Sequence, residues 1–332
     1  MSSSKLIVIF GSTGNQGGSV VNSFLDDPVW RVRAITRNSS SPKAQALATR
    51  GAEVVQADID SPATLSAALE GAHAIFAVSD FWGLYGDPAN RSKAKPGQPL
   101  NVWAGEHETQ QLKNVIDAAA KVPTLERFIL SSLSNPTKWS KGKYTHVYHF
   151  DSKANAEQYG RDKYPELFAK TSVFQAGLFL SNFVLNGITK LVKNADGVVQ
   201  FIGALDVDNK LPFIAAEEDS GPIVKALVQE PAGKNLIAYR EWLTLRELAE
   251  IFTKATGRKA EAVTVPKGQF GPGVPDELKQ ELEDNFAYFN EFGYEGRDDP
   301  TVIHPRELES PPSLDTVYDY FKKQNWSKVF NE

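Results

Sequence analysis

KLIVIFGSTGNQGGSV, residues 5–20, joins a short apolar run to a glycine-rich turn and then to a segment whose apolar residues recur at helical spacing. The glycines allow a tight turn, a close approach of backbone N–H groups to a pyrophosphate, and close packing of the helix on the strand. We therefore predict a dinucleotide site here; the alternative is a glycine turn with only a structural role. The turn residues predicted to bind the dinucleotide are Gly11, Thr13, Gly14, Asn15, Gln16 and Gly17.

Strand-like and helix-like segments alternate along the first half of the chain. Strands are predicted over residues 5–10, 31–36, 53–57, 74–78, 127–131 and 171–175. Helices are predicted between them, over residues 17–26, 41–49, 62–69, 107–121 and 151–159. This alternation predicts an α/β fold of the Rossmann type, a doubly wound parallel sheet that binds its ligand outside the carboxyl ends of the strands.

The pattern changes twice along the chain. Residues 81–105 follow a strand and are rich in Gly, Pro, Asn and Lys, so we expect a loop over the ligand site. Beyond residue 182 the alternation loosens, and helices are predicted after a capping box at Thr244 and Glu247 and again over residues 275–289. We therefore expect a nucleotide-binding Rossmann domain, residues 1–182, and a smaller, mainly helical C-terminal domain, residues 183–332, that completes a substrate cleft.

The composition of the 332 residues narrows the functions to be considered. The formal net charge is −5 and no basic run occurs, so we expect no nucleic-acid partner. The absence of cysteine excludes disulfides, thiolate metal sites and cysteine nucleophiles in this chain. The five histidines lack metal-ligand spacing, and we predict no metal site. No apolar run reaches the roughly 18 residues of a membrane span, so we expect a cytoplasmic protein without membrane contact.

The residues after the second predicted strand bear on the choice of dinucleotide. Sites selective for NAD place an acidic residue there to bond the ribose 2′-OH, whereas sites selective for NADP place an arginine. Here Arg37 follows the strand, with Asn38 and Ser39 next to it. We predict NADP(H), with Arg37 at the 2′-phosphate and its two neighbours as further donors; the alternative is a solvated surface arginine. Asp58, after the third strand, is either a partner of the adenine amino group or a turn residue.

Five motifs in order along the chain resemble the NmrA-like family, an atypical branch of the short-chain dehydrogenase/reductase superfamily. They are GSTGNQG (residues 11–17), Thr36-Arg37, GAEVVQAD (residues 51–58), RFILSS (residues 127–132) and HFDSK (residues 149–153). The resemblance covers nearly the whole chain and implies a Rossmann fold, NADP(H) and a helical C-terminal subdomain. It leaves the function divided, because some members resemble NADP-dependent reductases, notably in fungal secondary metabolism, and others resemble redox-sensing regulators.

The superfamily normally uses a serine, a tyrosine, and a lysine four residues after the tyrosine. By this resemblance Lys153 holds the nicotinamide ribose, and Ser131 or Ser132 orients the substrate. His149 stands where the tyrosine is expected. Either its imidazole donates the proton, or it is a packing residue at a site without proton transfer. Weaker candidates are Tyr144 and Tyr148 as donors, Phe81 and Trp82 as pocket walls, the backbone of residues 175–177 (Gln-Ala-Gly) near the nicotinamide carboxamide, and Asn182 and Asn186 at the cleft.

Two functions are compatible with these residues. The first is an NADP(H)-dependent oxidoreductase that reduces a small organic carbonyl, imine or enone, with Lys153, His149 and Ser132 as catalytic residues. The second is a non-catalytic NADP(H) sensor or transcriptional co-regulator, whose conformation a protein partner detects. The retained lysine and serine favour the enzyme with its small-molecule substrate, and the missing tyrosine favours the sensor.

Overall fold

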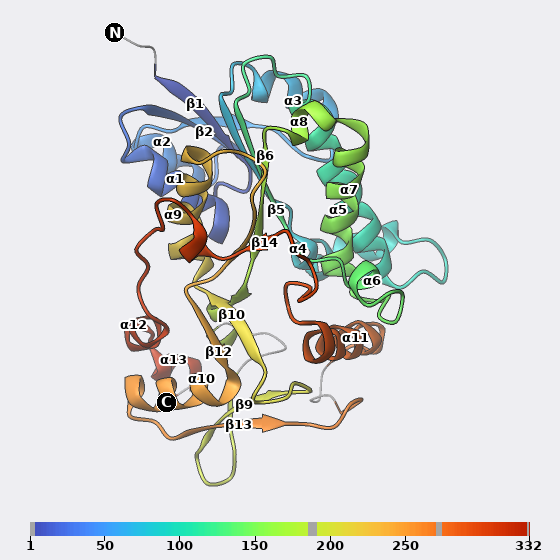
Figure 1. The fold of residues 1–332 in the computed structure, drawn as a ribbon, viewed down its shortest axis with the longest axis vertical. Coiled ribbons are helices and arrows are strands. Elements are labelled where there is room, and N and C mark those ends of the chain that lie inside the picture. Colours follow the sequence, from blue (N-terminus) through green and yellow to red (C-terminus); the bar gives the residue numbers. More distant parts are fainter. Residues whose placement is uncertain (1–3, 185–190, 270–273, 331) are drawn as a thin grey trace.

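An eight-stranded sheet forms the centre of the molecule (Figure 1). The computed structural model describes residues 4–184, 191–269, 274–330 and 332. In spatial order the strands are β14 (Val302–Ile303), β11 (Asn235–Ala238), β6 (Thr171–Ala176), β5 (Arg127–Ser132), β4 (Ala74–Ala77), β1 (Lys5–Ile9), β2 (Trp30–Thr36) and β3 (Glu53–Gln56). All neighbouring strands are parallel, which confirms the predicted Rossmann-type fold and all six predicted strands. The strand order reverses between β1 and β4, the point at which such sheets bind ligands.

Helices cover both faces of the sheet, as Figure 1 shows. One face carries α1 (Asn15–Leu25), α2 (Pro42–Thr49) and α9 (Ala216–Gln229). The other carries α3 (Pro62–Leu69), α5 (Leu100–Ala119), α7 (Tyr148–Lys163) and α8 (Pro165–Phe168). The five predicted helices of this half are confirmed, with α5 and α7 longer than expected.

Alternating side chains of β1 supply the two cores. Ile7 and Ile9 pack with α1 and α9, whereas Leu6, Val8 and Phe10 pack with α3 and α5. All five side chains are buried, because the strand lies between two helical layers. An unbroken apolar run before the glycines is therefore what this position in the sheet requires.

The prediction of a loop over residues 81–105 is wrong in part. This segment contains α4 (Phe81–Gly86), the 3-10 helix η1 (Pro88–Lys93) and the first turns of α5. The carboxylates of Asp80 and Asp87 accept N–H bonds from the starts of α4 and η1, at 2.9 and 3.0 Å. These caps, together with a small apolar cluster of Phe81, Leu100, Trp103 and Ala104, stabilise helices despite the glycines and prolines.

The C-terminal part contains the two predicted helices. α10 (Leu245–Thr256) begins at the capping box of Thr244 and Glu247 and ends at Gly257, whose φ is +70°. The second predicted helix is α11 (Asp276–Phe292), and two short helices follow, α12 (Val317–Lys323) and α13 (Trp326–Phe330).

Two small sheets in the C-terminal part were not predicted. One has the order β12 (Glu241–Thr244), β10 (Lys210–Ile214), β7 (Leu178–Phe179), and the other β13 (Ala260–Thr264), β9 (Val199–Gly203), β8 (Val192–Lys193). The large sheet also takes α9, β11 and β14 from beyond residue 182, so the chain passes more than once between the two parts. The division at residue 182 stays a prediction.

Two kinds of feature are absent from the described residues. No helix among them is both long enough and apolar enough to span a membrane. They also contain no group of three or more His, Asp or Glu side chains arranged to hold a metal ion.

Candidate cofactor and proton-transfer site

The turn between β1 and α1 leaves no room for a side chain at two of its glycines, Gly11 and Gly17. Gly11 has φ +61°, and a Cβ there would lie 2.7 Å from Val78 Cγ1. A Cβ on Gly17 would lie 2.3 Å from the Gly11 carbonyl oxygen, far inside contact distance. The Gly14 N–H closes the turn by donating to Gly11 O at 2.9 Å. The three predicted glycines therefore form one compact turn at the switch point of the sheet.

The first turn of α1 presents backbone N–H groups without a local capping group. Gly14 is its N-cap residue, no side chain among the described residues caps these donors, and the first turn holds no acidic residue. Such a helix start favours an anion through its N–H groups and its dipole. Thr13 is half-buried and Asn15 exposed, while the Gln16 side-chain oxygen accepts a bond from Ser131 Oγ at 2.9 Å.

Arg37 lies exposed after β2 and has no ion-pair partner among the residues the structure describes. Lys43, in α2, places its Nζ 3.4 Å from the Thr13 carbonyl oxygen in the glycine turn. Lys43 was missed by sequence reasoning, although its position in the first turn of a predicted helix beside Arg37 was a usable signal. Lys43 thus contacts the turn, and residues 37–41, which begin with Arg37, contain no acid.

The other predicted nucleotide contacts already have partners. Asn38 Oδ1 accepts bonds from the N–H and the hydroxyl of Ser40, at 3.0 and 2.7 Å. Ser39 Oγ donates to Gln56 Oε1 at 3.1 Å. Asp58 Oδ1 accepts the Asp60 N–H at 3.0 Å, the arrangement of a turn residue. These bonds order the loops after β2 and β3, and the nucleotide contacts of Asn38, Ser39 and Asp58 remain predictions.

Lys153 is bound to a buried carboxylate. Its Nζ lies 2.8 Å from both oxygens of Glu108 and donates to the His149 carbonyl oxygen at 3.0 Å. Glu108 is fully buried in α5, and its carboxylate also accepts bonds from the hydroxyls of Ser79 and Ser152. The three protons of the Lys153 ammonium group therefore all face acceptors within the chain.

The two serines at the end of β5 have different partners. Ser131 Oγ contacts Gln16 in the first turn of α1, whereas Ser132 Oγ donates to the Leu133 carbonyl oxygen at 3.4 Å. Both serines are buried. The structure thus connects Ser131 to the glycine turn, and the predicted role of Ser132 is not tested.

His149 lies in the first turn of α7 and contacts a carboxylate from a distant helix. Glu281 Oε1, in α11, lies 2.6 Å from His149 Nδ1 and accepts the His149 backbone N–H at 3.1 Å. Glu281 Oε2 accepts a bond from Asn101 Nδ2 at 3.0 Å. The Glu281 side chain is fully buried, while the His149 side chain keeps 12% of its surface exposed.

Aromatic rings enclose the His149 imidazole. Trp82 and Phe81 of α4 lie with ring centroids 5.0 and 5.7 Å away, and Phe150 packs edge-on at 4.9 Å. Trp82 is itself 41% exposed. The imidazole thus lies in an apolar surrounding at the edge of the molecule, where water is partly excluded.

The family model of the NmrA-like family matches residues 3–322. The chain belongs to the NmrA-like family. Among curated relatives of this NmrA-like protein, the NmrA-like family domain-containing oxidoreductase hkm9 of Aspergillus hancockii is 32% identical over 271 residues, covering 77% of this chain and 74% of that protein. The oxidoreductase ptmS of Penicillium ochrochloron, with the same family description, is 28% identical over 346 residues, covering 96% and 98%.

Solved structures share the fold of this NmrA-like protein. NmrA, described as a negative transcriptional regulator, in complex with NADP, has a TM-score of 0.72 at 21% identity, covering 99% of this chain and 92% of that one. The NADPH-dependent quinone oxidoreductase QOR2 of Escherichia coli, complexed with NADPH, has a TM-score of 0.66 at 23% identity, covering 95% and 98%. One of these neighbours is a regulator and the other an enzyme, so the fold alone does not decide between the two functions.

The weaker site candidates of this NmrA-like protein bind other groups of the chain or lie outside the described residues. The Tyr144 hydroxyl donates to Glu291, and burial raises the pKa of the Tyr148 phenol, with nearby carboxylates adding to the shift. Gln175 Nε2 donates to Asn235 Oδ1 at 2.8 Å in the buried contact between β6 and β11. Asn186 lies outside the described residues.

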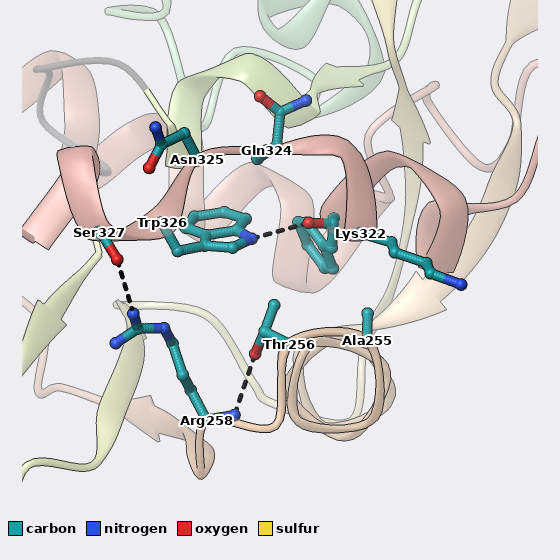
Figure 2. Close-up of a pocket in the computed structure, with 9 residues that line it drawn as sticks. Ala255, Thr256, Arg258, Lys322, Gln324, Asn325, Trp326 and Ser327 are labelled. Atoms are coloured by element: carbon teal, nitrogen blue, oxygen red, sulfur yellow. Dashed lines mark hydrogen bonds between the residues drawn. The ribbon is translucent and has the colours of Figure 1, made fainter.

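A surface pocket of about 410 Å³ lies elsewhere in this NmrA-like protein, between the end of α10 and helices α12 and α13 (Figure 2). Trp326 Nε1 donates to the Phe321 carbonyl oxygen at 2.7 Å, and the Arg258 N–H donates to Thr256 Oγ1 at 3.1 Å. The Arg258 guanidinium also binds Glu332 at 2.6 Å. These polar groups hold the C-terminal helices together, and no predicted site residue lines the pocket.

Proposed function

We propose that this protein is an NADP(H)-dependent oxidoreductase that reduces a small organic carbonyl, imine or enone. The observation that carries the proposal is the glycine turn: Gly11 and Gly17 let the chain pack more closely than any Cβ would allow, and the turn leads into a helix start without a side-chain cap. A pyrophosphate fits this arrangement, because it needs backbone N–H donors and close approach. The relatives named as oxidoreductases support the same activity.

Arg37 and Lys43 favour NADP(H) over NAD(H). The Lys43 ammonium group contacts the glycine turn, Arg37 is exposed directly after β2, and the residues that follow β2 offer no carboxylate for a free 2′-OH. A planar guanidinium and a nearby ammonium group match the charge and the oxygens of a 2′-phosphate.

His149 is the proposed proton donor. NADPH, when bound, would supply a hydride to the substrate carbon, and the substrate oxygen or nitrogen would then need a proton. His149 Nε2 can give that proton, because imidazole exchanges protons near neutral pH. Phe81 and Trp82 would keep water from the transferring groups and contact the substrate.

One observation favours the second function, a non-catalytic NADP(H) sensor with a protein partner. Lys153 binds Glu108 through both carboxylate oxygens and binds the His149 carbonyl oxygen, so a cofactor ribose would have to compete with these acceptors. Exchange of one of these bonds on cofactor binding would move α7 relative to α5. In the sensor, that movement would be the signal that the partner detects.

The test compares binding and turnover of the purified protein. Calorimetry with NADPH, NADP⁺, NADH and NAD⁺ should give clearly tighter binding of the two phosphorylated nucleotides. NADPH absorbance is then followed with a panel of carbonyl, imine and enone compounds. Substrate-dependent loss of NADPH supports the enzyme, whereas tight but inert binding that differs between NADPH and NADP⁺ overturns the enzyme in favour of the sensor.

A further inference from the structure

Two histidine–carboxylate pairs join the start of α7 to α11, one helical turn apart. His149 pairs with Glu281, and His146 pairs with Asp284 through an Nδ1–Oδ2 distance of 2.8 Å. In both pairs the same carboxylate also accepts the backbone N–H of its histidine, at 3.1 and 3.2 Å. The two contacts therefore satisfy N–H groups at the start of α7, where the N-cap residue provides no side-chain acceptor.

The pairs differ in their surroundings. The His146 side chain is 45% exposed, whereas the His149 side chain is 12% exposed and enclosed by aromatic rings. Glu281 is fully buried, and Asn101 Nδ2, which also donates to the Glu277 carbonyl oxygen, fixes its second oxygen. Only the His149 pair therefore combines a rigid carboxylate with the apolar surrounding of the candidate site.

The bonding at Glu281 determines which ring nitrogen of His149 carries hydrogen. The Glu281 carboxylate accepts from the His149 N–H and from Asn101 Nδ2, and its Oε1 lies 2.6 Å from His149 Nδ1. A carboxylate that accepts at 2.6 Å requires Nδ1 to be the protonated nitrogen. Nε2 has no hydrogen-bond partner in the described part of the chain, and the His149 side chain keeps 12% of its surface exposed. Nε2 is thus the ring nitrogen free to exchange a proton.

We infer that Glu281 is the positioning residue of the proton-transfer step: it fixes Nδ1–H of His149 and directs Nε2 to the substrate. The inference rests on the proposed function. In a carbonyl reduction, the bound cofactor would supply hydride from a C–H bond of its reduced nicotinamide, and that hydride would form the new C–H bond of the substrate as the π pair moves to oxygen. The Nε2–H bond breaks as the O–H bond forms, and water then reprotonates Nε2. Glu281 keeps its charge throughout and stabilises the imidazolium before transfer.

Other charges near His149 do not replace Glu281. Asp151 of α7 lies two residues after His149, and its Oδ2 accepts a hydrogen bond from the Thr137 hydroxyl at 2.6 Å. Lys153 contacts the backbone carbonyl oxygen of His149 and not its ring. The charge of Lys153 is balanced by Glu108 of α5. α4 contributes aromatic rings and no charged side chain to this contact. Glu281 is therefore the carboxylate in direct contact with the ring.

The test uses Glu281→Gln, with Asp284→Asn as the matched control. Glutamine offers one carbonyl oxygen and no charge at the position where the Glu281 carboxylate meets three donors. With the fastest of the carbonyl, imine and enone compounds, kcat should therefore fall on the order of 100-fold, while KM should change little. The basic limb of the pH–rate profile should move to lower pH, because an anionic neighbour favours the imidazolium form. Asp284→Asn removes the equivalent pair between the same helices and should leave kcat and the pH profile unchanged.

Nitrogen NMR of ¹⁵N-histidine-labelled wild-type protein gives a readout that does not depend on turnover. The His149 ring, assigned with His149→Phe, should carry its hydrogen on Nδ1 when neutral. A neutral ring with hydrogen on Nε2 overturns the inference, as does wild-type kcat in Glu281→Gln or an equal loss in Asp284→Asn. Absence of turnover by the wild type with every compound instead overturns the proposed enzyme, and this role with it.

Discussion

At the scale of single residues, Arg37 is the side chain expected to decide cofactor choice. Replacing Arg37 with alanine removes a charged donor to the 2′-phosphate, and NADPH binding should weaken about 10- to 100-fold. NADH binding should change less than about threefold, because NADH carries no 2′-phosphate. Calorimetry measures both. Arg50→Ala is the control, since that exposed arginine binds Asn22. Equal losses for NADPH and NADH in Arg37→Ala would contradict the assignment.

His304 should make the stability of the fold depend on pH. Burial lowers the pKa of His304 below 6.5, and its Nδ1 lies 3.0 Å from the Tyr239 hydroxyl. Below pH 6.5, His304 therefore binds a proton more readily in the unfolded chain than in the folded protein. The stability that neutral His304 contributes is fully present above pH 6.5 and is lost as the pH falls through the pKa of His304 in the folded protein. Urea unfolding at pH 7 and pH 5 should show a smaller pH difference for His304→Asn than for the wild type. An identical pH difference in both proteins would refute this linkage.

Sequence reasoning identified residues that act through the backbone or through local spacing. Gly11, Gly14 and Gly17 lie in one short turn, so their spacing alone predicts their packing. Glu108 and Glu281 were missed because their partners are 45 and 132 residues away, at Lys153 and His149. A buried glutamate on an otherwise ordinary helix gives no signal in the sequence, because only the tertiary fold determines which charge it meets.

At the scale of elements, the contact between α1 and α9 should be intolerant of added volume. A Cβ on Gly221 of α9 would lie 2.2 Å from the Ser19 carbonyl oxygen and 2.3 Å from Ser23 Oγ. The Gly221 N–H also donates to Ser19 Oγ at 2.9 Å, which fixes the separation of the helices. Gly221→Ala should therefore lower the free energy of unfolding by about 1–3 kcal/mol, measured by urea denaturation.

Gly86→Ala is the matched control for that substitution. Gly86 ends α4, and an added Cβ there meets no atom within 4 Å. Its free energy of unfolding should stay within about 0.5 kcal/mol of the wild type. If both variants lose the same stability, the close approach of α1 and α9 is not the cause.

Elements with strong periodicity were predicted, and elements held by caps or by neighbours were not. The run of residues 5–10 and the capping box at Thr244 contain their signal within a few residues. α4 depends on the Asp80 cap and on the apolar cluster of Phe81 with residues of α5. The strands β7 and β8 have only two residues each. Such short strands form because a partner strand is already in place, which no local pattern can encode.

At the scale of the whole molecule, Arg240 connects the large sheet to the C-terminal part. Its guanidinium binds Asp219 of α9 at 2.9 and 2.6 Å and donates to the Thr316 carbonyl oxygen, the N-cap of α12, at 3.1 Å. Arg240 and Asp219 are both nearly inaccessible to solvent. Burial raises the pKa of Asp219, and the guanidinium of Arg240 opposes that shift. The pair therefore holds charge in the interior only while both partners are present.

Replacing one partner should cost more than replacing both. Arg240→Met leaves the Asp219 carboxylate buried without its cation, and the free energy of unfolding should fall by about 3–5 kcal/mol at pH 7. The deficit should shrink at lower pH, because protonation removes the uncompensated charge from Asp219. The double variant Asp219→Leu/Arg240→Met removes both charges and should recover part of the loss. Urea denaturation of the wild type, the two single variants and the double variant gives the coupling free energy between Asp219 and Arg240. A double variant no more stable than Arg240→Met would mean that the geometry of the pair, and not its charge balance, joins the sheet to the C-terminal helices.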